Sequence, residues 1–324
     1  MTKAIRMEAF GGTDVLKWQE IDLGAPAVGE VQIRHTAIGL NFIDTYHRTG
    51  LYPLPLPATP GLEAVGVVEA MGEGVESFKV GDRVGYPAGP IGAYAEARNI
   101  PAAKLVKIPD SVSDEDAAAL MLKACTVEAF VERLYPVKAG ETVLLHAAAG
   151  GVGLIACQWL SAIGATVIGT VGSPEKAELA KAHGCTHTVL YRDEDFVARV
   201  KDITNGEGVP VVYDSVGKAT FMGSLDCLKR RGVMVTFGNA TGPVDPVPPA
   251  LLAQKGSLML TRPVLMDYVA TRPELEHSTS RVFEMIASSK LKARINQHFA
   301  LKDAAEAHKA LEARQTSGQT ILIP

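Results

Sequence analysis

Residues 146–159, HAAAGGVGLIACQW, place three glycines between two apolar segments. Gly150, Gly151 and Gly153 follow a strand-like segment and precede apolar residues at helical spacing, which predicts a strand, a tight turn and a helix. Absent side chains at such a turn let a ligand approach the backbone, where the positive end of the helix faces it. Ala148 replaces the first glycine of a strict GxGxxG pattern, so a plain tight turn is an alternative. The segment indicates a site for the pyrophosphate of a dinucleotide.

Strand-like and helical segments alternate from about residue 125, which predicts a parallel sheet covered on both faces. Cofactors bind at the carboxyl edge of such a sheet. The later strands end in polar residues or glycine, which favours a dinucleotide site over a plain turn. These ends are residues 170–173, 191, 214–217 and 237–240, and the expected strands span residues 142–146, 166–170, 188–191, 210–214, 233–237 and 257–260.

The charges beside the second of these strands bear on the choice of cofactor. A site for NAD usually offers Asp or Glu at this strand's tip, to bind the ribose 2′-hydroxyl. The tip here reads GTVGSPEK and instead offers Ser173 and Lys176, with Tyr191 after the next strand. Taken singly, Ser173 is a helix N-cap and Lys176 a surface lysine. Together, and without the acid, these donors and this cation favour the 2′-phosphate of NADPH over NADH.

Composition limits the remaining classes of function. The chain has 324 residues, of which 47% are hydrophobic and 21% charged, with a net charge of -4. This predicts a folded chain of about two domains and argues against nucleic acid as the main partner. The basic run at residues 229–231 is more typical of a solvated helix end. Four widely spaced cysteines indicate buried thiols in a reducing compartment.

Two further segments bear on organisation. Residues 142–174 contain no Asp, Glu, Lys or Arg, but glycines and Gln158 interrupt them, so we expect a buried core and no membrane span. Residues 1–125 carry strand-like segments and turn signals too frequent for long helices, which predicts a small all-β barrel or sandwich. Residues 51–61 are expected to form a Pro-rich loop. Two amphipathic helices and the strand TILIP are expected after residue 263.

Five segments of the sequence together resemble the NADPH:quinone oxidoreductases. They are HAAAGGVGLIACQW, NFIDTYHRTGLYP, VVYDSVG, SLDCLKRRGVMVTFGN and QKGSL. These form the ζ-crystallin-like, zinc-free branch of the medium-chain dehydrogenase/reductase superfamily. The resemblance implies an α/β fold, with a GroES-like β-barrel catalytic domain and a Rossmann domain built on a doubly wound parallel sheet. The implied bounds are 1–125 for the catalytic domain, 126–262 for the NADPH-binding domain, and 263–324 for a segment that returns to the catalytic domain. A cytoplasmic homodimer joined through the Rossmann sheet edges is also implied.

The resemblance also concerns metal. Zinc-dependent relatives in this superfamily supply a Cys and a Gly-His-Glu element as ligands. Asn41 stands where the Cys would be, and Leu62 where the His would be, so Glu63 alone remains. We therefore expect no metal site.

Carried over residue by residue, the resemblance implies catalytic roles for Asn41, Tyr46 and Tyr52. One departure concerns CTVEAF, where Glu128 and Ala129 replace two aromatic residues of the family. An exposed helix position is the alternative interpretation of Glu128. The implied cofactor-binding residues are Asn41, Phe42, Ile43, Asp44, Thr45, Tyr46, Thr126, Gly150, Gly151, Val152, Gly172, Ser173, Lys176, Tyr191, Val216, Phe237, Gly238, Asn239, Ala240, Val264 and Arg314.

The chemistry expected is transfer of a hydride, or of single electrons, from NADPH to a quinone. The Asn41 amide and the hydroxyls of Tyr46 and Tyr52 are candidates to stabilise the acceptor oxygen, while capping by Asn41 and packing of the tyrosines are the alternatives. His47 is expected at the surface. Two other functions stay open: reduction of activated C=C bonds in enals or enoyl thioesters, and an AU-rich RNA-binding or crystallin-like structural role.

Overall fold

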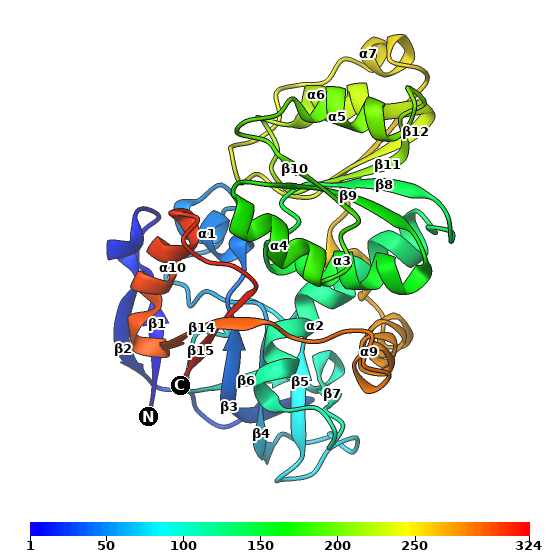
Figure 1. Ribbon diagram of the computed structural model, residues 1–324. Coiled ribbons are helices and arrows are strands. Elements are labelled where there is room, and N and C mark those ends of the chain that lie inside the picture. The colour runs from blue at the N-terminus through cyan, green and yellow to red at the C-terminus, as the bar shows by residue number, and fades with distance from the viewer. The chain divides into compact units, whose positions relative to one another are not determined.

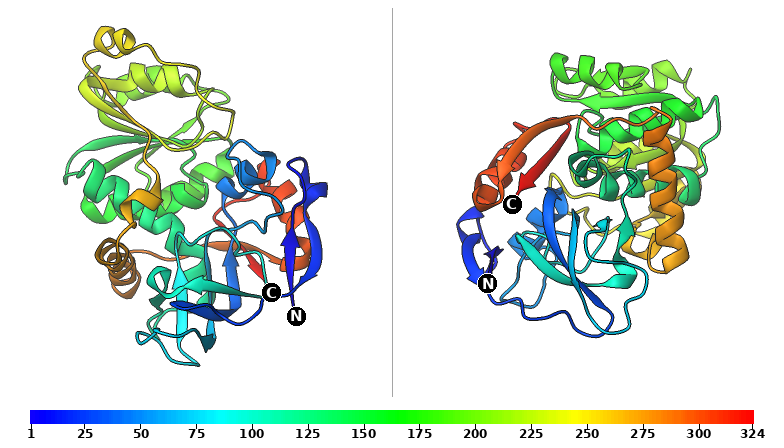
Figure 2. Two further views of the ribbon diagram at one scale, coloured as in Figure 1. Left: turned by 180° about the vertical axis from the view of Figure 1, so that it is seen from behind. Right: turned by 90° about the horizontal axis from the view of Figure 1, so that it is seen from below.

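The computed structural model describes residues 1–324, and their close contacts divide the chain into two units. The first unit contains Met1–Cys125 and Tyr268–Pro324, and the second contains Thr126–Asp267. Figures 1 and 2 show the path of the chain through both units. None of the helices combines the length and apolar character needed to cross a membrane.

The second unit is built on a six-stranded sheet with the order β10-β9-β8-β11-β12-β13. All neighbouring strands run parallel, which confirms the doubly wound sheet. The strand order reverses between β8 and β11, and ligands bind at such a switch point. The strands are β8 (Thr142–Leu145), β9 (Thr166–Val171), β10 (His187–Leu190), β11 (Val209–Asp214), β12 (Leu228–Thr236) and β13 (Met259–Thr261).

Helices cover both faces of this sheet, with α3 and α4 on one face and α5 and α6 on the other (Figure 1). Ile155, Trp159 and Leu160 of α3 are buried, as the helical spacing predicts. Helix α4 has Ser173 as its N-cap and Pro174 at its first position, which confirms the expected start. The helices are α3 (Gly151–Ile163), α4 (Pro174–Ala182), α5 (Phe196–Ile203), α6 (Phe221–Cys227) and α7 (Pro249–Gln254), preceded by a π-helix over Ala129–Leu134.

The first unit is mainly β-structure, organised around the long strand β3. Strand β3 pairs antiparallel with β4, β6 and β15, within a sheet of order β14-β15-β3-β4-β5-β7. Residues 51–61 lie outside every helix and strand, as expected of a Pro-rich loop. The strands are β1 (Thr2–Arg6), β2 (Lys17–Ile21), β3 (Glu30–Gly39), β4 (Ala64–Met71), β5 (Arg83–Tyr86), β6 (Ala97–Pro101) and β7 (Val106–Lys107).

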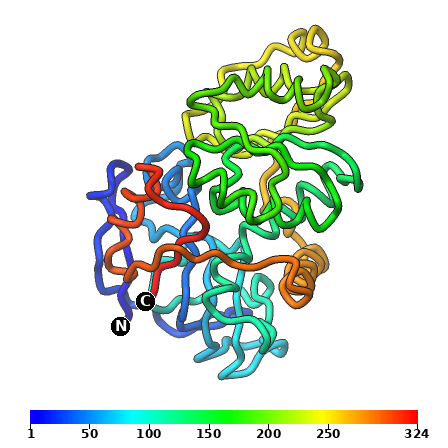
Figure 3. The backbone as a smooth tube through the Cα atoms, viewed as in Figure 1, coloured from blue at the N-terminus to red at the C-terminus, as the bar shows by residue number.

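The end of the chain completes this sheet, because β15 (Gln319–Ile323) lies between β3 and β14 (Ile295–Ala300). Figure 3 shows this last segment, in orange and red, beside the blue N-terminal strands of the same unit. The segment also holds α9 (Arg272–Ala287) and α10 (Ala304–Glu312), as expected, together with the shorter α8 (Leu265–Tyr268). Strand β14 was not predicted.

Two helices interrupt the part of the chain that was expected to be all β-structure. They are α1 (Phe42–Thr49) and the longer α2 (Asp114–Glu128). Helix α2 escapes a periodicity argument because its apolar residues surround it, as in a helix buried on most sides. The expectation of no long helix before residue 125 was therefore wrong.

Because β15 ties the chain's end into the sheet, Leu322→Ala is expected to destabilise the first unit. Leu322 is fully buried in the core. The cavity and the lost burial should lower the free energy of unfolding by about 2–5 kcal/mol, measured by urea denaturation. Val28→Ala is the control, because Val28 is 75% exposed and should change stability by less than about 0.5 kcal/mol. Equal stabilities for the two variants would contradict the assigned packing.

Candidate cofactor and substrate site

The turn after β8 is too tight for side chains at one of its glycines. A Cβ added to Gly153 would lie 2.2 Å from the carbonyl oxygen of Ala147 and 2.7 Å from the carbonyl carbon of Ala148. Ala147 itself has a φ of 55°, in the left-handed region that few non-glycine residues adopt. Helix α3 starts immediately after this turn, with Gly150 as its N-cap. A bare turn leading into a helix start fits a pyrophosphate group.

The residues predicted to bind the adenosine phosphate gather after β9. A Cβ on Gly172 would lie 2.9 Å from the Tyr191 hydroxyl, so this tyrosine leans over the end of β9. The Ser173 hydroxyl accepts a hydrogen bond from the Lys176 N–H at 3.4 Å, which confirms its role as N-cap. Lys176 is half-buried and Tyr191 is 42% exposed. Ser173 and Tyr191 therefore lie just after neighbouring strands, and Lys176 lies in the first turn of the helix that follows β9.

The loops after β11 and β12 are fastened to each other. The Asp214 carboxylate accepts hydrogen bonds from the N–H groups of Val216 at 2.8 Å and Gly217 at 3.0 Å. Gly238 packs directly on the Ser215 carbonyl, where a Cβ would lie 2.2 Å from the oxygen. These loops contain the predicted residues Val216, Phe237, Gly238, Asn239 and Ala240.

Three other predicted residues of this region are in different surroundings. Thr126, near the end of α2, is 8% exposed, whereas Val264 is 46% exposed. Arg314 is exposed and follows α10 in the first unit, with a φ of 58°. Only the loop residues of the second unit are thus brought to one edge of its sheet.

In the first unit, helix α1 carries most of the other predicted residues. Its N-cap is Asn41, and Phe42 and Ile43 are half-buried in its first turn. The rings of Phe42 and Tyr46 lie 5.5 Å apart, and those of Tyr46 and Tyr52 lie 5.2 Å apart. The structure therefore groups both candidate catalytic tyrosines on one side of α1.

The Asn41 amide is held by a buried carboxylate. Its Nδ2 donates to Glu63 Oε1 at 2.8 Å and more weakly to the Gly39 carbonyl oxygen at 3.4 Å. Glu63 Oε1 also accepts from Lys123 Nζ at 2.9 Å, and Glu63 Oε2 accepts from the Leu122 N–H at 2.7 Å. Glu63, Lys123 and Asn41 are 0%, 5% and 5% exposed, so charge is balanced inside the core. Both N–H donors of Asn41 are committed to protein acceptors.

These contacts also test whether zinc could bind there. The Lys123 ammonium already neutralises Glu63, and Asn41 and Leu62 supply neither a thiolate nor an imidazole. A zinc ion needs such ligands. The residues of this region do not fit a zinc ion.

Asp44 faces inward and joins a second buried network. Its Oδ2 accepts from the Asn41 N–H and from the Tyr94 hydroxyl, each at 2.9 Å. Tyr94 also contacts His308 Nε2 at 3.1 Å, and Arg48 contacts His308 Nδ1 at 3.2 Å. Burial raises the pKa of Asp44 to about 7 and lowers the pKa of His308 to about 3. Residues of α10 thus fix the orientation of α1.

One expectation about exposure, one alternative interpretation and one expectation about secondary structure are wrong. His47 is 7% exposed, and burial lowers its pKa to about 4. Glu128 is fully buried and pairs with Arg133 at 2.8 Å, so it is no surface residue. Residues 229–231 are exposed but begin strand β12 instead of ending a helix. The sequence around a polar residue does not show whether a distant residue will pair with it and so allow it to be buried.

The Thr45 hydroxyl is also bound within the protein, because it donates to the Phe42 carbonyl oxygen at 2.7 Å.

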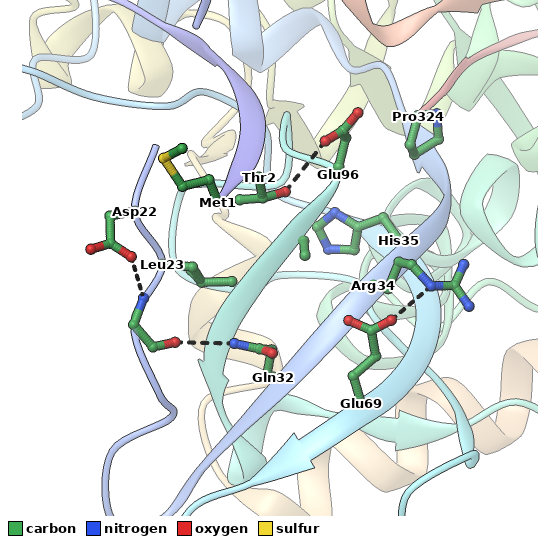
Figure 4. A pocket seen from close by; sticks show the side chains of 12 residues that line it. Met1, Thr2, Asp22, Leu23, Gln32, Arg34, His35, Glu69, Glu96 and Pro324 are labelled. Atoms are coloured by element: carbon green, nitrogen blue, oxygen red, sulfur yellow. Dashed lines mark hydrogen bonds and ion pairs between the residues drawn. The ribbon is translucent and has the colours of Figure 1, made fainter. Parts of the chain in front are cut away.

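A cavity lies elsewhere in the first unit, beside both chain termini (Figure 4). Its volume is about 670 Å³, and none of the predicted site residues lines it. Two of its charged groups already have partners, since Arg34 pairs with Glu69 at 2.8 Å and Glu96 accepts from the backbone N–H of Lys3 at 2.9 Å. This cavity is separate from the predicted site.

Two protein-family models match the chain, one within the first unit and one largely within the second. The alcohol dehydrogenase GroES-like domain matches residues 27–110, and the zinc-binding dehydrogenase domain matches residues 151–275. A quinone oxidoreductase of Pseudomonas aeruginosa is 50% identical over 325 aligned residues, with 100% of both chains covered. This chain belongs to the quinone oxidoreductase family of the medium-chain dehydrogenase/reductase superfamily.

Two further proteins that this chain resembles are informative. The crystal structure of Escherichia coli quinone oxidoreductase complexed with NADPH has a TM-score of 0.98 and 49% identity, covering 99% of this chain and 100% of that chain. A 2-haloacrylate reductase of a Burkholderia species is 44% identical, covering 100% of this chain and 99% of its own.

Several residues that organise the site in this family member were not predicted. They are buried polar side chains next to apolar residues: His146 directly follows β8, Asp214 ends β11, and Lys123 lies in α2. A buried polar group needs a partner. That requirement is the signal that could have singled them out, although it could not have named the partners.

Asp44 is expected to make stability depend on pH. Since its pKa rises from 3.8 to about 7 on folding, the folded state holds a proton that the unfolded state releases above about pH 4. This contribution is complete below pH 4 and is lost as pH rises to about 7. The unfolding free energy of the native protein minus that of Asp44→Asn should therefore fall between pH 4 and 7. Parallel curves from urea denaturation would contradict the assignment.

Proposed function

We propose that this protein catalyses the NADPH-dependent, zinc-independent reduction of quinones. The observation that carries the proposal is the full-length match, at about 50% identity, to quinone oxidoreductases. The geometry supports it, because a glycine turn without side chains, a group of residues able to donate hydrogen bonds to a phosphate, and a pair of tyrosines are each assembled within one unit.

NADPH would be held by the edge of the parallel sheet. The turn at Gly150, Gly151 and Val152 binds the pyrophosphate, and Ser173, Lys176 and Tyr191 bind the 2′-phosphate. When bound, NADPH supplies the hydride or the electrons. The remaining contacts are assigned to Gly172, Thr126, Val216, Phe237, Gly238, Asn239, Ala240, Val264 and Arg314, and to Phe42, Ile43 and Tyr46 of the first unit. The side chains of Asn41, Asp44 and Thr45 bind other groups of the protein, so these three residues are assigned to the support of α1.

The tyrosines stabilise the quinone oxygen that gains charge during reduction. The Tyr46 and Tyr52 hydroxyls are the donors in this role, because hydrogen bonds aimed at developing charge lower the barrier. Asn41 acts differently from the sequence-based expectation. Its N–H donors bind Glu63 and Gly39, so it positions the start of α1.

A second activity is favoured by one specific match, the 44% identical 2-haloacrylate reductase. Reduction of an activated C=C bond needs the same reductant and a similar arrangement of donors. NADPH oxidation measured against quinones, 2-haloacrylates, enals and enoyl thioesters separates the two activities. Turnover on quinones alone supports the first, and turnover confined to the unsaturated acids, aldehydes or thioesters overturns it.

We also infer a cytoplasmic homodimer. Strand β13 ends the six-stranded sheet and leaves one edge for a second copy, with Met259 53% exposed on it. The four cysteines are buried free thiols, as is typical of a reducing compartment. Sedimentation equilibrium tests the dimer, and a monomer at micromolar concentration would contradict it.

Tyr46→Phe is expected to lower kcat on quinones by about tenfold to a hundredfold, since one donor to the reacting oxygen is lost. The KM for NADPH should change less than about twofold, as the ring packing with Phe42 and Tyr52 is retained. Steady-state kinetics measure both. Tyr135→Phe is the control, because that hydroxyl binds Glu141. Unchanged turnover in Tyr46→Phe would remove this hydroxyl from the chemistry.

Lys176→Ala is expected to raise the KM for NADPH about tenfold or more and to leave the KM for NADH nearly unchanged. The lost ammonium group interacts with a phosphate that NADH lacks. Lys181→Ala provides the matched control one turn later on α4, where Lys181 pairs with Glu178. If the preference between the two nucleotides is the same in both variants, the 2′-phosphate assignment is wrong.

A further inference from the structure

Four buried polar side chains connect the ends of three neighbouring strands in the second unit. His146, directly after β8, contacts Thr170 Oγ1 of β9 through Nδ1 and Ser224 Oγ of α6 through Nε2, each at 2.9 Å. Ser224 Oγ lies 3.0 Å from Asp214 Oδ2, at the end of β11. The four side chains are at most 2% exposed, so water does not replace these bonds.

The protons in this chain of bonds have one consistent direction. Ser224 Oγ lies 3.0 Å from Asp214 Oδ2 and 2.9 Å from the Thr220 carbonyl oxygen, and both of these only accept, so the serine hydroxyl donates on this side. Ser224 Oγ then accepts from His146 Nε2–H, which leaves His146 Nδ1 as the acceptor for the Thr170 hydroxyl. Burial lowers the pKa of His146 and keeps the imidazole neutral, as this tautomer requires.

Each end of this series of hydrogen bonds binds the backbone of a turn. Thr170 Oγ1 accepts from the N–H of Ala147 at 3.3 Å, at the residue with the left-handed backbone in the glycine turn. Asp214 Oδ1 accepts from the N–H groups of Val216 and Gly217. The two turns flank the switch point between β8 and β11. A single run of hydrogen bonds therefore connects them.

We propose that Thr170, His146 and Ser224 are positioning residues that couple the glycine turn to the Val216–Gly217 turn, so that both backbone segments take their binding geometry together. The inference rests on the proposed function, in which these turns contact different parts of NADPH. None of the three side chains needs to touch the cofactor. Loss of one link should disturb the turn at the far end as well as the near one.

Thr170→Val tests the coupling, because it keeps the shape of the side chain and removes the hydroxyl. The Kd for NADPH, measured by fluorescence titration, should rise about tenfold, in line with one buried polar partner left unsatisfied. Thr170→Ser retains the hydroxyl and should stay within about twofold of the native protein. Thr166→Val is the matched control, since it makes the same change at the opposite end of β9.

Hydrogen–deuterium exchange of the cofactor-free protein distinguishes coupling from local damage. In Thr170→Val, exchange should become faster in residues 145–153 and also in residues 214–218. Ser224→Ala removes a link near Asp214, and it should make exchange faster in residues 145–153. This second variant keeps the test possible if Thr170→Val does not fold. Changes confined to the mutated end would overturn the proposal. Native protein that binds no NADPH would refute the proposed function, whereas the exchange result would still decide the coupling.

Discussion

The close approach of the Gly153 backbone to the Ala147 carbonyl group is the constraint on which the second unit depends. A side chain at Gly153 would overlap that oxygen, so the turn can close only with glycine there. The closed turn starts α3 directly beneath the end of β8 and leaves bare backbone at the switch point of the sheet. The hydroxyl, phenol and ammonium groups after β9 and β10 then complete an edge suited to a doubly phosphorylated ligand.

The first unit depends on a different interaction, which stabilises the buried carboxylate of Glu63 in its core. Glu63 is neutralised by Lys123 and hydrogen-bonded by Asn41 and Leu122. A buried carboxylate without such partners would be costly. The arrangement holds the amino end of α1, and Asp44 with Tyr94 holds its first turn. A charge pair inside the protein thus occupies the place where a metal-dependent relative would need ligands.

Much of the fold could be predicted from the sequence, because parallel strands and the helix after the glycine turn have strong local patterns. Ser173 and Pro174 marked the start of α4 correctly, since capping depends on adjacent residues. Helix α2 was missed because a helix buried on most sides has no apolar stripe. The commitment of Asn41 to Glu63 and the burial of Glu128 could not be foreseen, as each depends on a partner that only the folded chain brings near.

We propose above that the glycine turn after β8 binds the pyrophosphate of NADPH, and a crystal structure of the protein grown with NADPH is the decisive measurement. We expect pyrophosphate oxygens within hydrogen-bond distance of the backbone N–H groups at residues 150–152, with the 2′-phosphate beside Ser173 and Lys176. A cofactor bound with its pyrophosphate away from this turn would show that the glycine turn is not the binding site.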